Sequence, residues 1–245
     1  MDIILNNIGL AFFCLIVGYL FGSIPNGVWV GKIFFKDDVR NHGSHNSGGT
    51  NVSRVYGFKY GFLVYLFDFL KVAIPLWGMW AILTFVNIGE MPLIPNTARY
   101  LSGETSQFIV QWPVYWLVAL GAVIGHCYPV LAQFKGGKAA SVTFSTAIFG
   151  SWFAGIVSML SFVITLKIKK YISLSSIVGS IMASVAAWLT CIPQIGVYLM
   201  YGSTLAPGYV FAIVMTLATI VLIIRHKENI SRIAKGTESK ITFLK

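Results

Sequence analysis

The strongest constraint on the fold of this chain is a series of long apolar stretches that carry almost no charge. There are six of them: Ile8–Val30, Tyr60–Ile88, Trp112–Phe134, Ala139–Leu166, Tyr171–Cys191 and Pro207–Ile224. A helix that crosses a bilayer needs about 20 predominantly apolar residues. Only 11% of the 245 residues are charged, whereas soluble domains carry roughly 25%. The sequence predicts an all-α, multi-span membrane helix bundle that forms a single domain over residues 1–245.

Lysine and arginine are concentrated in few places along the chain. Sixteen of the 18 basic residues lie in the segments 31–59, 135–138, 167–170 and 225–245. The positive-inside rule places such segments in the cytoplasm. The segments 1–7, 89–111 and 192–206 contain only Arg99 between them and are expected outside. The amino end is therefore predicted outside the cell and the carboxyl end in the cytoplasm.

The fourth apolar stretch joins two segments that are both expected in the cytoplasm, so it must cross twice or re-enter. Its middle contains the potential turn Gly150-Ser151-Trp152. We expect a short helix over about 139–150 and a second helix to about 167, which raises the number of crossings to seven. The sequence leaves open whether 139–150 is a full span or a re-entrant helix.

The first polar patch is glycine-rich and follows the first apolar stretch. It reads Asn41-His42-Gly43-Ser44-His45-Asn46-Ser47-Gly48-Gly49-Thr50-Asn51 and is followed by Arg54. Glycine lets backbone N–H groups approach a ligand closely, and arginine makes bidentate contacts with phosphate. The patch is a candidate phosphate site, and the alternative is a polar turn that caps a helix.

Two further basic patches lie later in the chain. Phe134-Lys135-Gly136-Gly137-Lys138 precedes the expected short helix, and a glycine pair there is suited to an anion nest. Arg225-His226-Lys227-Glu228-Asn229-Ile230-Ser231-Arg232 follows the last stretch, where helical spacing places His226 and Asn229 on one face. Each patch alone is also explained by cytoplasmic loops that contact anionic lipid, which is the simpler account of the net charge of +10.

Three other features complete the polar inventory. Asp68 and Lys71 lie inside the second stretch at i, i+3, where a structural ion pair is expected. His126 lies in an apolar segment and is interpreted as a satisfied polar residue, with Pro129 kinking its helix. The three cysteines are scattered among apolar neighbours and contain no CxxC, so we infer neither a disulfide nor a metal site.

Taken in order, the motifs run through most of the chain. They are Gly22-Ser23-Ile24-Pro25, Gly27, Asp38, Arg40, Gly43-Ser44, Asn46, Gly48, Thr50-Asn51, Arg54, Asp68-Phe69-Leu70-Lys71, Gly125-His126, Pro129, Phe134-Lys135-Gly136-Gly137-Lys138, Arg225-His226, Asn229-Ile230, Arg232 and Glu238. In this order they resemble the bacterial acyl-phosphate:glycerol-3-phosphate acyltransferases. The resemblance implies a seven-helix membrane enzyme whose site faces the cytoplasm. It also implies transfer of a fatty acyl group from acyl phosphate to the sn-1 hydroxyl of glycerol 3-phosphate, which yields lysophosphatidic acid and phosphate without a cofactor or metal.

The resemblance also implies which residues form the site. The catalytic candidates are Ser44, Arg54, Lys138, His226 and Asn229, and the substrate-binding or phosphate-binding candidates are Gly43, Asn46, Gly48, Thr50, Asn51, Gly136 and Gly137. We interpret Arg54 and Lys138 as phosphate holders, and His226 and Asn229 as residues that orient glycerol 3-phosphate. The proton acceptor is either His226 or a phosphate oxygen of the substrate.

The chain departs from the usual family pattern at four positions. His45 and Ala139 stand where glycine is usual, Ser47 where proline is common, and Gly49 where alanine is common. The expected partners are acyl phosphate, glycerol 3-phosphate and membrane lipid, with no nucleic acid. Two alternatives remain: a transporter of an organic phosphate, which would be expected to show repeated halves, and a structural membrane protein.

Overall fold

The computed structural model describes residues 2–85, 113–192, 196, 199 and 208–241, and within them the chain is all-α. The helices are α1 (Asp2–Gly22), α2 (Asn26–Phe35), α3 (Gly49–Tyr56), α4 (Phe58–Phe85), α6 (Trp116–Cys127), α7 (Ala140–Gly150), α8 (Trp152–Lys169), α9 (Ile172–Leu189), α11 (Tyr209–Arg225) and α12 (Lys227–Ala234). Two 3₁₀ turns, η1 (Val39–Asn41) and η2 (Val130–Ala132), lie in the connections. The predicted external loop 89–111 falls outside the described residues.

Four stretches of the described chain are long and apolar enough to cross a membrane. They are Ile8–Phe35, Phe58–Leu83, Trp152–Lys169 and Ile172–Leu189. A fifth span results if the bent pair α11 and α12 is counted as one. Helices α6 and α7 are apolar but shorter. The fold is therefore an all-α membrane helix bundle with four or five candidate spans, and the expected seven crossings stay a prediction.

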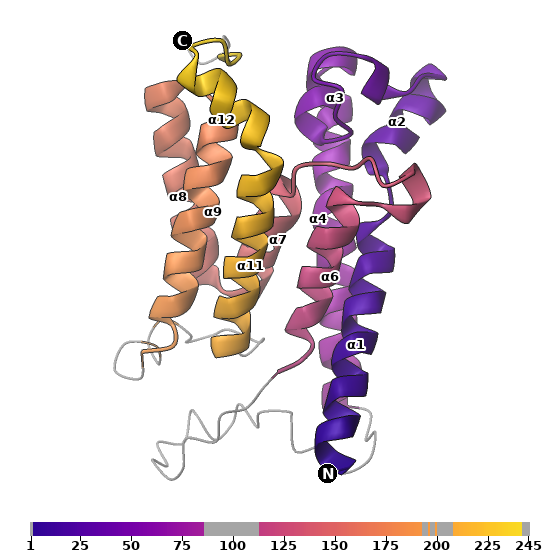
Figure 1. Cartoon of the computed structure of the whole chain (residues 1–245), viewed down its shortest axis with the longest axis vertical. Helices are drawn as coiled ribbons and strands as arrows, with labels where there is room; N and C mark the ends of the chain where they lie inside the picture. The colour runs from indigo at the N-terminus through magenta and orange to yellow at the C-terminus, as the bar shows by residue number, and fades with distance from the viewer. Residues whose placement is uncertain (1, 86–112, 193–195, 197–198, 200–207, 242–245) are drawn as a thin grey trace.

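The helices are arranged in two groups. Helices α1, α4 and α6 pack together in one group, and α8, α9 and α11 in the other. Helix α7 contacts members of both groups and lies between them (Figure 1). Buried side chains from both groups, including Trp116, Phe211, Leu76 and Met215, form one continuous apolar core.

Glycines bring α1 and α6 into close contact. A methyl group at Gly18 or Gly22 would collide with backbone atoms of Val118 or Ala122, and one at Gly121 or Gly125 with carbonyl oxygens of α1. Both helices thus carry glycines four residues apart, the spacing that lets the backbones of membrane helices approach closely. This contact fixes α6, and with it the loop that follows α6.

The predicted break in the fourth apolar stretch is confirmed. Helix α7 ends at Gly150 and α8 begins at Trp152. Ser151 between them has extended backbone, and its side chain accepts a hydrogen bond from the Ala154 amide at 3.4 Å, which caps α8.

Three other helix boundaries differ from the sequence-based expectation. The first apolar stretch is not one helix, because α1 ends at Gly22 and α2 begins after Pro25. Pro129 does not kink α6, which already ends at Cys127. The last stretch does not continue as one straight helix into the third patch, since α11 and α12 meet at 57° around His226.

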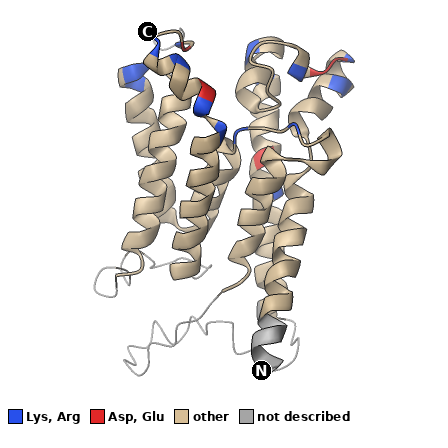
Figure 2. Ribbon diagram, in the orientation of Figure 1, with Lys and Arg blue, Asp and Glu red and all other residues tan. Residues whose placement is uncertain are grey.

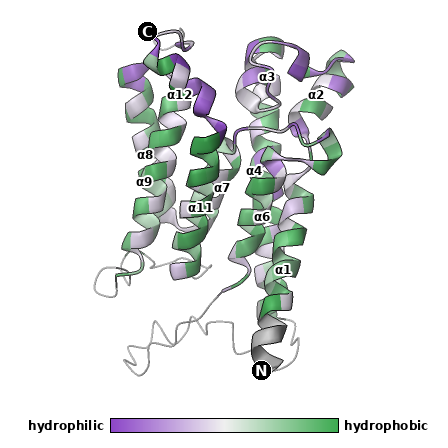
Figure 3. Ribbon diagram, viewed as in Figure 1, coloured by the Kyte–Doolittle hydropathy of each residue, from purple (hydrophilic) through white to green (hydrophobic). Residues whose placement is uncertain are grey.

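Most charged residues of the described chain gather at one end of the bundle, whereas Asp68 and Lys71 lie within α4. Figure 2 shows lysine and arginine at the end that carries α2, α3 and α12, and Figure 3 shows the same end as hydrophilic. The helices below it are mainly hydrophobic. All three sequence patches therefore lie at the same end of the molecule.

Candidate active site

The loop between α6 and α7, which contains the second patch, is held by the other two patches. Arg40, which directly precedes the first patch, donates through Nη1 to the Ala132 carbonyl at 2.9 Å, and Asn46 of that patch donates through Nδ2 to the Gly136 carbonyl at 3.4 Å. From the third patch, Arg225 Nε donates to the Gly137 carbonyl at 3.2 Å. Three regions far apart in sequence thus meet at this loop.

Lys138 is joined directly to the third patch. Its Nζ donates to Asn229 Oδ1 at 2.7 Å, and Asn229 Nδ2 donates to Glu238 Oε1 at 2.7 Å. Glu238 also accepts from Ser173 at 2.6 Å and from Arg232 at 2.7 Å. Burial opposes ionisation of Glu238, but these hydrogen bonds outweigh it and lower its pKa. The carboxylate therefore stays ionised and fixes the orientation of the Asn229 amide.

The positive charge of Lys138 is in a partly desolvated setting. Burial lowers its pKa, and the neighbouring cations Arg232 and Arg225 act in the same direction. Glu228 and Glu238 oppose the shift. A partly buried ammonium group is a stronger electrostatic partner for an anion than one in bulk water.

His226 lies at the bend after α11 and is 4% exposed. Its Nδ1 lies 2.9 Å from the Leu222 carbonyl oxygen, which only accepts, so Nδ1 carries the proton and donates. Burial lowers the pKa of His226 to about 4, so the ring is neutral near pH 7. Its Nε2 then bears a lone pair that accepts a hydrogen bond.

The first patch is organised around the buried side chain of Asn51. Its Nδ2 donates to the carbonyls of Val39, His42 and Asn46, and its Oδ1 accepts from the Ser44 amide at 2.8 Å. A methyl group on Gly43, which has a φ of +59°, would collide with Asn51 Oδ1. In this structure Asn51 and Gly43 shape the loop that presents Ser44, whose side chain is exposed.

The remaining candidates of the first patch differ in the hydrogen bonds that they make within the protein. Asn46 Oδ1 accepts from the Gly48 amide at 2.8 Å, and Thr50 Oγ1 lies 2.6 Å from Tyr65 OH. Arg54, on the last turn of α3, is exposed and makes no hydrogen bond or ion pair with another side chain in the described ranges. It is free to contact a ligand but does not contact the other two patches.

The expected anion nest at Gly136 and Gly137 is not formed in this structure. The Gly136 amide donates to the Cys127 carbonyl at 3.2 Å, and the Gly137 amide to the His126 carbonyl at 2.9 Å. Glycine is required here because a methyl group at Gly137 would collide with the His126 ring. The pair folds the loop tightly against the end of α6, which turns both amides away from solvent.

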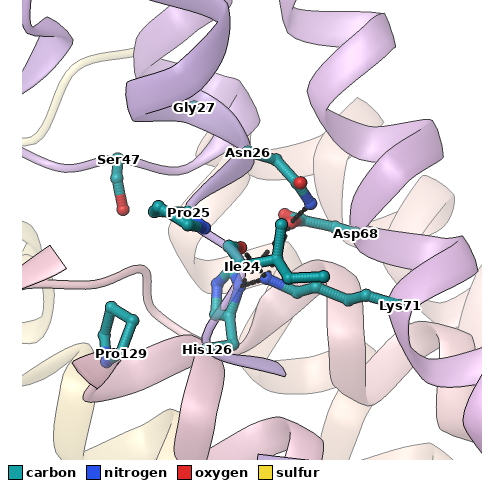
Figure 4. Close-up of a pocket in the computed structure, with 9 residues that line it drawn as sticks. All are labelled: Ile24, Pro25, Asn26, Gly27, Ser47, Asp68, Lys71, His126 and Pro129. Atoms are coloured by element: carbon teal, nitrogen blue, oxygen red, sulfur yellow. Dashed lines mark hydrogen bonds and ion pairs between the residues drawn. The ribbon is translucent and has the colours of Figure 1, made fainter. Parts of the chain in front are cut away.

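A buried ionic cluster lies beneath this loop (Figure 4). Lys71 Nζ lies 3.0 Å from Asp68 Oδ1 and 2.9 Å from His126 Nδ1, and it donates to the Ile24 carbonyl at 3.2 Å. Asp68 also accepts from Asn26 at 2.9 Å and from Ser141 at 2.7 Å. The predicted structural ion pair is confirmed, and His126 is satisfied as expected. The cluster ties α2, α4, α6 and α7 together and lines a small pocket.

Two of the four departures from the family pattern lie at left-handed backbone positions. His45 has a φ of +54° and Ala139 a φ of +66°, where glycine is the least strained residue. His45 adopts this conformation with its Nδ1 3.0 Å from the Arg40 carbonyl. Histidine therefore adopts here the left-handed conformation that glycine takes most easily.

Sequence reasoning did not assign a role to Arg40, Arg225 or Glu238, although all three belong to the motifs. Each acts on a residue of another patch or of its own loop, and charge pattern alone does not show which backbone carbonyls an arginine will reach. Their position within the ordered series of motifs was the available signal.

Comparison with known proteins gives a consistent result. The family described as glycerol-3-phosphate acyltransferase matches residues 12–236. Two relatives named glycerol-3-phosphate acyltransferase are similar over nearly the whole chain. The protein of Aster yellows witches'-broom phytoplasma (strain AYWB) is 33% identical over 95% of this chain and 97% of its own. The protein of Staphylococcus aureus (strain JH9) is 35% identical over 94% of this chain and 97% of its own.

Two solved structures share the fold. Both are crystal structures of PlsY (YgiH), an integral membrane glycerol 3-phosphate acyltransferase, at 30% identity over 96% of each chain. The glycerol 3-phosphate form superposes with a TM-score of 0.71 and the lysophosphatidic acid form with 0.67. The family match favours an enzyme over a transporter of organic phosphates or a structural membrane protein. The chain belongs to the integral membrane glycerol-3-phosphate acyltransferase family, as its motifs and its helix bundle both indicate.

Proposed function

We propose that this glycerol-3-phosphate acyltransferase takes its acyl group from acyl phosphate and transfers it to the sn-1 hydroxyl of glycerol 3-phosphate. Lysophosphatidic acid and inorganic phosphate leave as products. The observation that carries the proposal is the 2.7 Å contact between Lys138 and Asn229, which joins two basic patches beside the third at one end of an apolar bundle. Such a place suits two phosphorylated substrates, one of which has a fatty tail.

Acyl phosphate is already an activated donor, so the protein needs no covalent nucleophile. Its task is to hold two anions side by side and to stabilise the oxyanion of the tetrahedral intermediate. We assign phosphate binding to Lys138 and Arg54, and donation to phosphate or oxyanion to the exposed hydroxyl of Ser44. Gly43, Gly48 and Asn51 shape the loop that carries Ser44.

His226 and Asn229 are assigned to glycerol 3-phosphate. The unprotonated Nε2 of His226 accepts a hydrogen bond from a glycerol hydroxyl and so orients it. A pKa of about 4 makes this histidine a weak base at neutral pH. A phosphate oxygen of the bound substrates is therefore the better acceptor of the hydroxyl proton, with His226 in an orienting role.

The site faces the cytoplasm in this proposal, and the single domain crosses the membrane seven times with its amino end outside. The four basic segments support that orientation through the positive-inside rule. The test is labelling of single cysteines in a cysteine-free background. Lys227→Cys should react only with reagent that reaches the cytoplasm, and Ser102→Cys only from outside. The opposite pattern would overturn the orientation without affecting the reaction.

The donor is tested on purified protein in detergent with each donor supplied separately. With acyl phosphate and glycerol 3-phosphate, formation of lysophosphatidic acid should be matched by an equal release of phosphate. Acyl-CoA and acyl carrier protein should give no product when acyl phosphate is absent. Transfer from either of these thioesters would contradict the proposal.

A further inference from the structure

Four carbonyl oxygens of the loop between α6 and α7 accept hydrogen bonds from two arginines that are distant in sequence. Arg40 Nη1 donates to Ala132 at 2.9 Å and to Lys135 at 3.3 Å. Arg225 donates through Nε to Gly137 at 3.2 Å and through Nη2 to Gly136 at 3.3 Å. The two guanidinium groups thus bind adjacent halves of the segment 132–137, directly before Lys138.

Each arginine is itself held in place. Arg40 donates through Nε and Nη2 to the Asp38 carboxylate at distances from 2.7 to 3.1 Å, and its hydrogen bond holds the pKa of Asp38 below the ordinary value. The guanidinium carbon of Arg225 lies 5.2 Å from the centre of the Tyr128 ring, a cation–π contact. Neither side chain therefore behaves as a freely moving surface charge.

The contacts have an electrostatic consequence for anion binding. A carbonyl oxygen carries partial negative charge, and four of them close to Lys138 would repel a phosphate group. The guanidinium groups cover these oxygens and leave net positive charge at the loop. They also hold the backbone on which Lys138 is mounted, and a displacement of about 1 Å at a reacting group can reduce a rate by about 100-fold.

We propose that Arg40 and Arg225 are positioning residues that clamp the segment 132–137 and so set where Lys138 holds phosphate. Arg40 fixes this segment relative to the first patch, and Arg225 fixes it relative to His226 and Asn229. The inference rests on the proposed function, in which Lys138 binds phosphate. An arginine that only stabilised the fold would leave the affinity for substrate unchanged.

The experiment measures kcat and KM for glycerol 3-phosphate in Arg40→Gln and Arg225→Gln, together with their melting temperatures. Controls that remove the same charge are Lys59→Gln and Lys167→Gln, which change exposed lysines outside the three patches. We expect KM to rise tenfold or more in both arginine variants, at melting temperatures close to that of the unchanged protein, and less than twofold in both controls. Arg225→Lys keeps the charge but loses the guanidinium group that donates through both Nε and Nη2, so it should give an intermediate KM.

Two outcomes would overturn the clamp. One is an unchanged KM with a kcat that falls in proportion to the folded fraction, as a purely structural role predicts. The other is an equal rise of KM in the lysine controls, which would indicate general electrostatic attraction. If Arg225→Gln does not fold, the KM of Arg225→Lys decides in the same way.

Lys138→Gln measured in parallel separates this inference from the proposed function. Full activity in Lys138→Gln removes Lys138 from the site and overturns the proposed function and the clamp together. An inactive Lys138→Gln, combined with unchanged KM values in the arginine variants, overturns only the clamp.

Discussion

Lys138 and Asn229 are 91 residues apart in sequence, yet Lys138 Nζ donates to Asn229 Oδ1 at 2.7 Å. Asn229 presents its oxygen to Lys138 because its amide nitrogen is engaged by Glu238 at 2.7 Å. The contact joins the loop before α7 to the first turn of α12. It links the second patch to the third, and the hydrogen bond from Asn46 Nδ2 to the Gly136 carbonyl at 3.4 Å links the first patch to the second.

Close packing of α1 against α6 predicts a strong effect of one methyl group. Gly121→Ala should lower the free energy of unfolding by about 1–3 kcal/mol, because the new methyl group would collide with the Leu15 carbonyl. Thermal melting in detergent measures the effect. The matched control is Gly78→Ala in α4, where nothing lies within 4 Å and alanine should be neutral or slightly stabilising. Equal melting temperatures for the two variants would contradict the packing argument.

The buried ion pair predicts that removing one of its two charges destabilises the protein more than removing both. Lys71→Met leaves the Asp68 carboxylate buried without a cation, at a cost of about 3–5 kcal/mol. The double variant Asp68→Asn with Lys71→Met removes the uncompensated charge and should recover part of that stability. Melting of the two variants side by side tests this, and a double variant less stable than Lys71→Met would count against a charge-based explanation.

Burial of neutral His226 predicts a pH dependence of stability. Its pKa is about 4 in the folded protein and about 6.5 in an unfolded chain. The unfolded state therefore binds more protons between these values, so the contribution of His226 is present above pH 6.5 and is lost as pH falls through about 4. At pH 5 the loss should reach about 2 kcal/mol.

The comparison for this prediction is His226→Asn, whose amide can still donate to the Leu222 carbonyl. Melting temperatures of both proteins at pH 7.5 and pH 5 provide the measurement. The unchanged protein should lose more stability on acidification than the variant. An equal fall in melting temperature for both proteins would show that His226 is not the group that titrates.

The left-handed backbone at His45 predicts that glycine is stabilising there. His45→Gly should raise the free energy of unfolding by roughly 1 kcal/mol, because glycine adopts a φ of +54° without strain. Asn41→Gly is the control, since Asn41 is exposed and is not among the described residues with positive φ. Glycine should be destabilising at that position. The account of the loop is wrong if both substitutions change melting in the same direction.

The parts of the fold that follow from local rules were predictable from the sequence. The break at Ser151 follows from charge placement, and the Asp68–Lys71 pair follows from helical spacing in an apolar segment. The site candidates came from the resemblance, because glycine and basic residues alone also fit loops that contact lipid.

Features that depend on tertiary contacts were not predictable. The Gly136 and Gly137 amides bond to the end of α6, although their sequence is that of an anion nest. Helical spacing predicted that His226 and Asn229 share a helix face, but it did not predict the 57° bend between α11 and α12 at His226. The reach of Arg40 to the Ala132 carbonyl spans 92 residues, and no local pattern encodes such a contact.

The central claim, that three distant loops form one site, is tested most directly by one substitution in each loop. The measurement is the rate of phosphate release from acyl phosphate that depends on glycerol 3-phosphate, in Arg54→Ala, Lys138→Ala and His226→Ala. Each variant should lower kcat/KM by about 100-fold or more while remaining folded in the membrane. Full activity in a folded variant of any one loop would contradict a site built from all three.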